Sequence, residues 1–363
     1  MEVYVNRVKR VRELMEERDI QCLFTAPSSN IFYLTGVKTT LDERLQLAVL
    51  SREGPLFLVL PEMYKEAASD LGEGFELLTW ADQQDPMEPV REACGTIKGR
   101  AAVDPKLWAG HLLRLMETFK DCTFVDAGEL LGKVRSIKDE EELRCLKKAG
   151  ELADEVMGEV LKEISVGMTE LELAHFIERK IKEKGADDIS FKPIVASGPN
   201  GAMPHHIPGD RNIEKGDLVV LDFGAVLEGY CSDITRTVFV GKAGNEEKEI
   251  YRIVMEANEA GYRAAVTGAL CGDVDRAARE VIDRAGYGRF FIHRTGHGIG
   301  LDYHEEPYIV EGSKVSLEKG MVFSVEPGIY IPQRFGIRIE DIVAVTDRGP
   351  VRLNNFPREL VEV

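Results

Sequence analysis

LVVLDFGAVLEGYCSDITRTVFVG, residues 218–241, is the stretch around which the chain is organised. Two apolar, β-branched runs meet at Glu228-Gly229, which predicts a β-hairpin, yet each run carries an aspartate. Aspartate is depleted inside strands. A turn at Glu228-Gly229 places Gly224 opposite Asp233, with Asp222 one pleat away on the same face. Two desolvated carboxylates this close repel each other, so the hairpin predicts a bound cation, most simply a divalent metal ion.

A second stretch, Met321–Thr346, repeats this pattern downstream. It predicts a hairpin that turns within Gln333–Gly336, with Glu326 on one strand and Glu340 on the other. That turn brings the two glutamates close to opposite one another. The sequence therefore places four strand carboxylates on two hairpins.

Histidines are concentrated between and before these hairpins. Five of the seven fall between residues 205 and 304, namely His205, His206, His293, His297 and His304. A structural ion-pair network would need matching cations, and only Arg338 is available locally, so the cluster predicts a metal site. Oxygen ligands with one imidazole and no thiolate favour Mn, Co, Zn or Fe(II) over copper, without selecting among them. A zincin motif is excluded because Arg294 follows His293 where H-E-x-x-H needs glutamate.

These motifs carry a family resemblance. LDFGA with SDITRT, then GHGIGLDYHEEP, VEPGIY and GIRIED, resemble the metal-binding signature of the pita-bread metallopeptidases, specifically the Xaa-Pro aminopeptidase and prolidase branch. The resemblance covers nearly the whole chain. It implies a centre of two divalent metal ions and a peptide substrate with proline at the second position. The ligands that it implies are Asp222, Asp233, His297, Glu326 and Glu340.

The resemblance also implies catalytic roles. A two-metal centre lowers the pKa of a bridging water and holds a hydroxide nucleophile at neutral pH. Glu326 would carry the proton from that water, while His205 and His304 would contact the substrate carbonyl and stabilise the tetrahedral intermediate. His293 would line the same pocket, and a buried structural role is the alternative for each histidine. Arg338, on the face of Glu340, is predicted to hold a ligand carboxylate by a hydrogen bond.

Length and composition indicate two domains. The chain has 363 residues, 44% of them hydrophobic, which is ample for more than one core. Residues 1–131 alternate helical and strand patterns, an α/β arrangement that the family's N-terminal domain shares. The helices are expected at 6–18, 62–70 and 107–119, and the strands at 22–25, 46–50, 55–60 and 100–103.

Residues 132–363 are predicted to form the α+β pita-bread catalytic domain. A long helix at about 139–164 and a capping box at Thr169-Glu-Leu-Glu172, which starts a second helix, precede the first hairpin. The same order of two helices and a hairpin follows Gly244. This weak internal duplication predicts both hairpins in one sheet, with helices on its outer face.

Net charge, cysteine spacing and hydropathy limit which partners and which cellular location are expected. A net charge of -17 argues against a nucleic-acid partner, which needs a basic face. The six cysteines are scattered without a C-x-x-C pair and are expected to be free thiols. No run of 18 apolar residues or export signal is present, so no membrane partner is expected and the protein is expected to be cytoplasmic. A homodimer is implied by the resemblance.

Dipeptidase and aminopeptidase remain open as activities. A dipeptidase must bind the free carboxylate of the substrate's proline. Some prolidases of this family carry an arginine directly after the H-E-x-P segment, where this chain has Tyr308. Substitutes are His205, His304, Arg338 or Arg44 from a dimer partner, and the dipeptidase is slightly favoured.

Three further classes are weighed against these. Methionine aminopeptidases usually lack the N-terminal domain, and creatinase-like relatives lack the carboxylate ligands. A non-catalytic interaction protein on the same fold is the remaining alternative.

Overall fold

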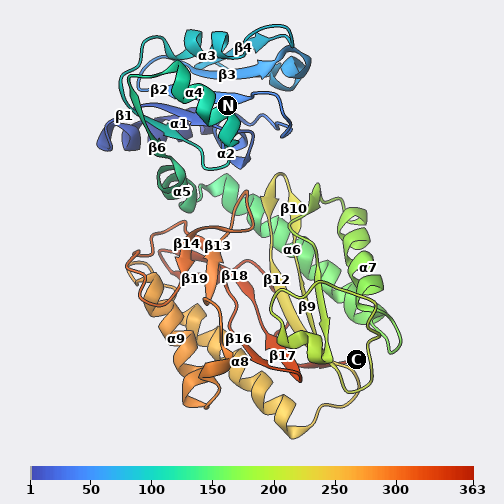
Figure 1. The fold of residues 1–363 in the computed structure, drawn as a ribbon. Helices are drawn as coiled ribbons and strands as arrows, with labels where there is room; N and C mark the ends of the chain where they lie inside the picture. The colour runs from blue at the N-terminus through green and yellow to red at the C-terminus, as the bar shows by residue number, and fades with distance from the viewer. Residues whose placement is uncertain (1) are drawn as a thin grey trace. The chain divides into compact units, whose positions relative to one another are not determined.

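The computed structural model describes residues 2–363, and the chain forms two compact units, Met1–Val134 and Arg135–Val363 (Figure 1). Helix α5, Gly128–Ser136, contains both this division and the boundary that the sequence places between residues 131 and 132. Within residues 2–363, no helix combines the length and the apolar character needed to cross a bilayer.

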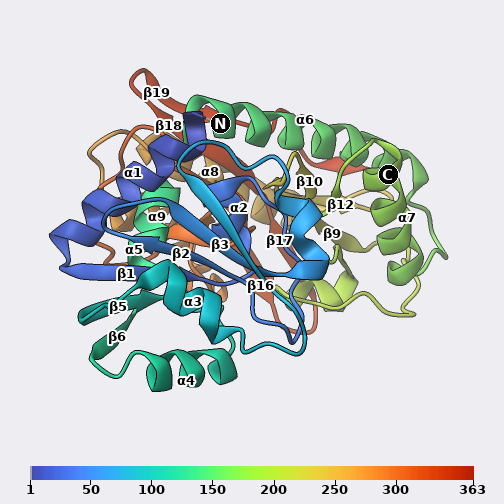
Figure 2. The ribbon, with the colours of Figure 1, turned by 90° about the horizontal axis from the view of Figure 1, so that it is seen from above.

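The first unit is an α/β domain built on a six-stranded sheet, seen from above in Figure 2. Its strand order is β4-β3-β2-β1-β5-β6, with β2 antiparallel to both neighbours and the other pairs parallel. The α/β class expected for this part of the chain is confirmed. Its elements are α1 (Glu2–Glu17), β1 (Ile20–Thr25), α2 (Ser29–Thr35), β2 (Leu47–Ser51), β3 (Leu56–Pro61), η1 (Glu62–Ala68), β4 (Phe75–Trp80), α3 (Met87–Cys94), β5 (Gly99–Val103), α4 (Ala109–Thr118) and β6 (Cys122–Asp126).

Strands β4 and β6 and helices α2, α3 and α5 were not expected from the sequence. Strands β4 and β6 are the sheet edges, and their residues are mostly half-buried or exposed, so their apolar pattern is weak. Helix α3 packs Met87 and Val90 into the same core as Leu115 of α4. The helix expected over residues 62–70 is the 3₁₀ segment η1, which starts after Pro61 without a side-chain cap, and 3₁₀ segments are short.

The second unit contains two helix pairs and four small sheets. Its helices are α6 (Glu140–Glu163), α7 (Glu170–Glu183), η2 (Gly198–Ala202), α8 (Asn245–Ala264), α9 (Cys271–Arg284) and η3 (Gly288–Phe290). Its strands are β7 (Asp188–Ile189), β8 (Ile194–Ser197), β9 (Leu218–Phe223), β10 (Ala225–Leu227), β11 (Tyr230–Cys231), β12 (Ile234–Phe239), β13 (Gly296–Gly298), β14 (Glu305–Ile309), β15 (Val322–Val325), β16 (Gly328–Ile331), β17 (Phe335–Arg338), β18 (Asp341–Thr346), β19 (Gly349–Arg352) and β20 (Val361–Glu362).

The helix pairs begin where the capping patterns predict. Asp139 caps α6 by accepting from the Glu142 backbone N–H, and the Glu142 side chain accepts from Asp139 in return. Thr169 and Glu172 form the same capping box at α7. Helices α6 and α7 then pack on β8, β9 and β12, while α8 packs on β16 and β17 (Figure 1). Helices therefore cover the strands that carry the carboxylates.

Both hairpins have the register that the sequence predicts. In the first, Asp222 pairs with Thr235 and Leu227 with Tyr230 around the Glu228-Gly229 turn, where both turn residues have positive φ. In the second, β15 pairs with β18 and β16 with β17 in a register that places Glu326 opposite Glu340. Period-two strand geometry then brings each pair of carboxylates to one face.

The expectation of one shared sheet is wrong. Each hairpin is interrupted near its carboxylates, so the strands divide into the sheets β20-β12-β9-β8, β11-β10-β7, β14-β13-β15-β18-β19 and β16-β17. A single bridge between Thr235 and Glu340 joins the first hairpin to the second. Pro327, which has no N–H to donate, follows Glu326 at one break. At another, a Cβ on Gly224 would lie 1.8 Å from the Ser232 carbonyl oxygen, so only glycine fits there.

Candidate metal centre

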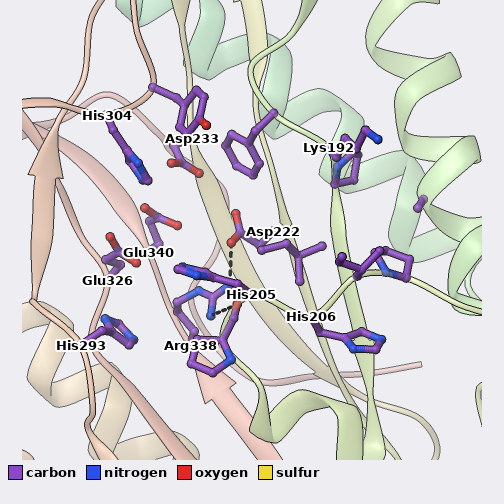
Figure 3. Close-up of a pocket in the computed structure, with 18 of the residues that line it drawn as sticks. Lys192, His205, His206, Asp222, Asp233, His293, His304, Glu326, Arg338 and Glu340 are labelled. Carbon is purple, nitrogen blue, oxygen red and sulfur yellow. Dashed lines mark hydrogen bonds and ion pairs between the residues drawn. The ribbon is translucent and has the colours of Figure 1, made fainter. Parts of the chain in front are cut away.

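Five predicted ligand residues converge on one wall of a cavity of about 860 Å³ in the second unit. Asp222 lies near the end of β9, Asp233 just before β12, Glu326 just after β15 and Glu340 just before β18, while His297 is the central residue of β13. Figure 3 shows the four carboxylates directed toward a common space. The structure therefore brings the five side chains that the sequence singles out to one cavity.

Three of these residues lie within chelating reach of one another. Ligand atoms of Asp233, His297 and Glu340 lie within 4.8 Å of one another. His297 Nδ1 donates to the Gly298 carbonyl oxygen at 3.0 Å, which leaves Nε2 without a proton and facing the carboxylates. His297 Nε2 is 3.3 Å from Glu326 Oε1 and 3.8 Å from Asp233 Oδ2. The imidazole is thus in the tautomer that a metal ligand needs.

Glycines allow His297 to reach this position. Strand β13 lies between β14 and β15. A Cβ on Gly296 would lie 1.8 Å from the Ser324 carbonyl oxygen, and one on Gly298 would lie 2.2 Å from that of Glu306. The backbones approach too closely for any side chain at these two positions, so glycine flanks the histidine on both sides.

Asp233, Glu326 and Glu340 have no Lys or Arg ion-pair partner among residues 2–363. Burial and then the charges of Glu340 and Asp222 raise the pKa of Asp233 well above its usual range. Burial followed by Glu326 does the same for the pKa of Glu340. Burial raises the pKa of Glu326 to about 7, although the charge of Arg338 acts in the opposite direction. Without a cation, the folded protein therefore favours the protonated forms of these acids.

Unpaired oxygens show where a cation fits. Asp222 Oδ1, Asp233 Oδ1 and Glu340 Oε1 are buried and have no hydrogen-bond partner among residues 2–363. Buried carboxylate oxygens normally have a hydrogen-bond partner, so three unpaired oxygens in one place indicate that another group binds there. A set of carboxylate oxygens with one imidazole nitrogen is a donor set that suits Mn, Co, Zn or Fe(II). The residues present therefore fit divalent metal ions.

Arg338 and Thr235 hold two of the carboxylates in place. Arg338 Nη2 donates to Asp222 Oδ2 at 2.5 Å, so Arg338 lies where the sequence predicts, against a candidate ligand. Thr235 Oγ1 donates to Glu340 Oε2 at 2.6 Å and accepts from Arg338 Nε at 3.2 Å. Each contact fixes one carboxylate oxygen and leaves the other directed at the metal position.

Ser324 orients two further candidate ligands at once. Its hydroxyl donates to Glu326 Oε1 at 3.1 Å and accepts from the His297 backbone N–H at 3.0 Å. The sequence prediction omitted both Ser324 and Thr235. Ser324 precedes Glu326 by two residues and Thr235 follows Asp233 by two, so strand periodicity was the signal that could have identified them.

His293 is held at both ring nitrogens. Its Nδ1 donates to the Arg294 carbonyl oxygen at 2.7 Å, and its Nε2 lies 2.8 Å from the Tyr330 hydroxyl. Tyr330 accepts from Arg338 Nη1 at 2.8 Å and can therefore donate its own proton to His293. Burial, followed by the charge of Arg338, lowers the pKa of His293 to about 4. Neutral His293 shapes the wall of the cavity and has no free nitrogen for a substrate.

His205 and His304 border the open part of the cavity. His304 packs edge-on against His297, with ring centroids 4.2 Å apart, and burial lowers its pKa. Figure 3 shows His205 and His304 beside the carboxylates. Neighbouring His206 also lines the cavity and contacts Glu170 at 2.7 Å through Nε2. His205 and His304 are thus the histidines placed to meet a substrate.

Glu170 anchors the segment that carries His205. This buried side chain accepts from the Ser197 backbone at 2.8 Å, from its hydroxyl at 2.6 Å and from Asn200 at 3.0 Å, besides contacting His206. Burial raises its pKa, but the hydrogen bonds from Ser197 and Asn200 bring it below the usual range. An ionised Glu170 therefore ties η2 and His206 to the first turn of α7.

A buried ion network supports the segment that follows His304. Glu305 accepts from Arg135, and Lys138 Nζ lies 3.4 Å from Glu305 Oε2. Arg135 also binds Asp302 at 2.9 Å. Because the Glu305 side chain is 6% exposed, its charge depends on these two cations.

These features form a candidate metal site of carboxylates and one histidine, set between two helix-covered hairpins. The sequence model of metallopeptidase family M24 matches residues 144–347, and that of the creatinase/prolidase N-terminal domain matches residues 7–137. The chain belongs to metallopeptidase family M24, and its second unit has the pita-bread fold.

Similar proteins cover the chain along its whole length. A Xaa-Pro dipeptidase of Pyrococcus horikoshii is 34% identical over 99% of this chain and 100% of its own. The solved structure of a dipeptidase from Pyrococcus horikoshii OT3 has a TM-score of 0.94 at 41% identity, covering 98% of this chain and all of its own. That of a prolidase from Thermococcus sibiricus has the same TM-score and identity, with 99% of each chain covered.

Proposed function

We propose that this protein is a metal-dependent exopeptidase that hydrolyses Xaa-Pro dipeptides. The observation that carries the proposal is the set of buried, unpaired carboxylate oxygens beside His297 Nε2 in a cavity large enough for a peptide. The names of the relatives, Xaa-Pro dipeptidase and prolidase, supply the substrate class. The peptide bond before proline has no N–H, so the enzyme must recognise this bond through the metal ions and side chains.

The proposed metal ligands are the five residues already described. Asp233, His297 and Glu340 form the tightest group, while Asp222 and Glu326 complete the set. Four carboxylate charges balance two divalent cations, which supports two ions rather than one. Mn, Co, Zn and Fe(II) are the candidates. When bound, the ions would polarise the scissile carbonyl and activate a water molecule.

The chain's own residues supply proton transfer and orientation. The Glu326 side chain is 15% exposed, which is more than the side chains of Asp222 and Asp233. We assign it the transfer of a proton to the leaving nitrogen. His205 and His304 border the same space and are assigned as donors to the carbonyl oxygen as it becomes negative. Arg338 pairs with Asp222 and orients it, and does not itself reach the substrate in this proposal.

Metal removal and reloading tests this function. Dialysis against a chelator should abolish hydrolysis of Ala-Pro, and separate addition of Mn, Co, Zn or Fe(II) should restore it to differing extents. Met-Ala-Ser and creatine serve as controls for the related activities. Turnover that survives chelation, or no turnover of any proline peptide after reloading, refutes the proposal.

A Xaa-Pro aminopeptidase is the second candidate. The cavity extends past the carboxylates to residues of α7, including Leu171, Ala174 and Glu178, so it has space for a longer chain. The deciding quantity is the ratio of kcat/KM on Ala-Pro to that on Ala-Pro-Ala. A ratio clearly above one supports the dipeptidase, and equal or better cleavage of the tripeptide supports the aminopeptidase.

A further inference from the structure

Among the described residues, three Lys or Arg side chains line the cavity: Lys192, Arg294 and Arg338. Arg338 is fully engaged, because it donates to Asp222, Thr235 and Tyr330. Within residues 2–363, the side chains of Lys192 and Arg294 have no hydrogen-bond or ion-pair partner. Arg338 is therefore not available to a substrate carboxylate, whereas two other cations are.

Arg294 is supported by an aromatic ring. Its guanidinium carbon lies 4.3 Å from the centroid of the Tyr308 ring. Tyr308 pairs with His297 across β13 and β14, so the two side chains lie on the same face of that ladder. Stacking on tyrosine orients a guanidinium without using any of its N–H donors. Arg294 thus borders the cavity with its hydrogen-bonding capacity free.

The backbone around Arg294 is fixed on both sides. His293 Nδ1 donates to the Arg294 carbonyl oxygen, and Arg279 Nη2 donates to that of His293 at 2.9 Å. Asp275 Oδ1 accepts from the Thr295 backbone N–H at 3.1 Å. Helix α9, which carries both Arg279 and Asp275, therefore holds this turn, and Arg294 projects from a preorganised segment.

Position favours Arg294 over Lys192 as the partner of a dipeptide carboxylate. That carboxylate carbon lies two bonds, about 2.5 Å, from the scissile nitrogen, so its partner must be near the candidate metal ligands. Arg294 lies over the ring of Tyr308, and Tyr308 is the cross-strand partner of the candidate ligand His297. Lys192 is exposed and lies on the far side of Asp222 from Glu326 (Figure 3).

We propose that Arg294, resting on Tyr308, binds the free α-carboxylate of the C-terminal residue of the substrate. This assignment rests on the proposed dipeptidase function and names the residue that makes the enzyme prefer dipeptides. A guanidinium can donate two parallel hydrogen bonds to a carboxylate, which a neutral C-terminal amide cannot accept in the same way. Tyr308 is a positioning residue, because it acts through Arg294.

The first test compares Ala-Pro with Ala-Pro amide on the metal-loaded full chain. Arg294→Gln should lower kcat/KM for Ala-Pro by about 10- to 100-fold, as expected for loss of a hydrogen-bonded charge pair. The same change should alter kcat/KM for the amide by less than about 3-fold. Arg289→Ala is the matched control, since Arg289 stacks on Phe290 at 4.6 Å but lies outside the cavity. Lys192→Gln tests the other free cation, and neither control should change the preference.

Binding of the product gives a readout that does not depend on turnover. Calorimetry should show that the wild type binds proline more tightly than prolinamide, and that Arg294→Gln removes the difference. An equal loss on acid and amide, or a preference that follows Lys192, overturns the proposal. If no Xaa-Pro peptide is cleaved but proline binding still depends on Arg294, the dipeptidase function fails while the anchor stands.

Tyr308 variants separate the ring from its hydroxyl. Tyr308→Phe keeps the stacking surface and should leave the KM for Ala-Pro within about 2-fold. Tyr308→Leu removes the ring and should raise that KM by about 3- to 10-fold with little change in kcat. A loss in kcat alone would contradict a positioning role.

Discussion

Asp233 shows how the fold changes the pKa of a single carboxyl group. It is 4% exposed and shares its surroundings with Glu340, Asp222 and Glu326, and its pKa is raised by burial first and by these carboxylates next. An acid whose pKa is higher in the folded than in the unfolded state stabilises the fold only while it is protonated. A bound metal ion replaces those protons, so metal affinity and stability are linked at this residue.

We therefore expect the metal-free protein to lose stability as the pH rises. The unfolded carboxyls ionise near pH 4, whereas Glu326 has a pKa of about 7 in the fold, so the loss should extend from about pH 4 to pH 7. In chelator, the Tm at pH 7 should lie at least about 3 °C below that at pH 5. Scanning calorimetry measures both values, and added metal should remove the difference.

Asp233→Asn should reduce this fall, because it removes one of the repelling charges. The variant should also bind fewer metal ions by elemental analysis and lose activity. Asp210→Asn, at an exposed position, is the matched control and should behave as the wild type. Full metal occupancy in Asp233→Asn would contradict the ligand assignment.

Thr235 offers a second prediction at this scale. Thr235→Val keeps the shape of this fully buried residue but deletes the hydroxyl that binds Glu340, so metal affinity should fall by about 10- to 100-fold. Thr237→Val is the matched control, because the Thr237 hydroxyl contacts only the Arg338 backbone. Metal titration followed by activity should show less than about 3-fold change in the control. Equal losses in both variants would indicate a general packing defect.

At the scale of elements, helix α7 positions the histidine segment through its first turn. Glu170 reaches into the unit to hold Ser197, Asn200 and His206, while Glu172 in the same turn faces solvent and completes the capping box. Two glutamates two residues apart thus have separate tasks. One fixes a segment of the cavity wall and the other fixes the helix start.

Glu170→Gln should therefore lower kcat without changing the metal content. The neutral amide has one fewer acceptor oxygen for the Ser197, Asn200 and His206 groups, so the segment carrying His205 loosens, and we expect a loss of about 10-fold or more. Glu172→Gln should leave kcat unchanged and cost at most about 1 kcal/mol of stability. Steady-state kinetics with metal analysis on both variants tests this, and equal kcat values would contradict it.

The same scale shows what the sequence predicts well. Hairpin register follows from period-two alternation and the position of the turn, so the meeting of Asp222 with Asp233 and of Glu326 with Glu340 was predictable. The division into several sheets was not, because it depends on local backbone approaches such as that at Gly224. The edge strands of the first unit carried too little alternation to be recognised.

Side-chain partnerships were predictable only where spacing encodes them. Arg338 lies two residues before Glu340, and that spacing sufficed to place it against a carboxylate. Arg294 and Tyr308 are brought together by the pairing of β13 with β14 and by an irregular turn, and no sequence spacing expresses their contact. The stacking of Arg294 on Tyr308 at the cavity could therefore be found only in the structure.

At the scale of the whole molecule, we propose a homodimer. Most soluble oligomers are closed two-fold assemblies. Ile207, which lines the cavity, is 81% exposed, so apolar surface is left open there. Light scattering at micromolar concentration should give twice the chain mass of 40.5 kDa. A mass equal to one chain would remove the proposal.

The network around Glu305 sets a limit on dissecting the protein into fragments. Its two cations, Arg135 and Lys138, precede helix α6. The charged run at the start of that helix would nevertheless suggest a domain boundary there. A fragment beginning at Asp139 would lack both cations and leave the buried Glu305, next to His304, without an ion-pair partner. We expect this to lower the free energy of unfolding by about 3–5 kcal/mol, whereas a fragment beginning at Lys133 would keep both cations. Expression and thermal melting of the two fragments should therefore show that the six residues 133–138 decide whether the catalytic unit folds stably by itself.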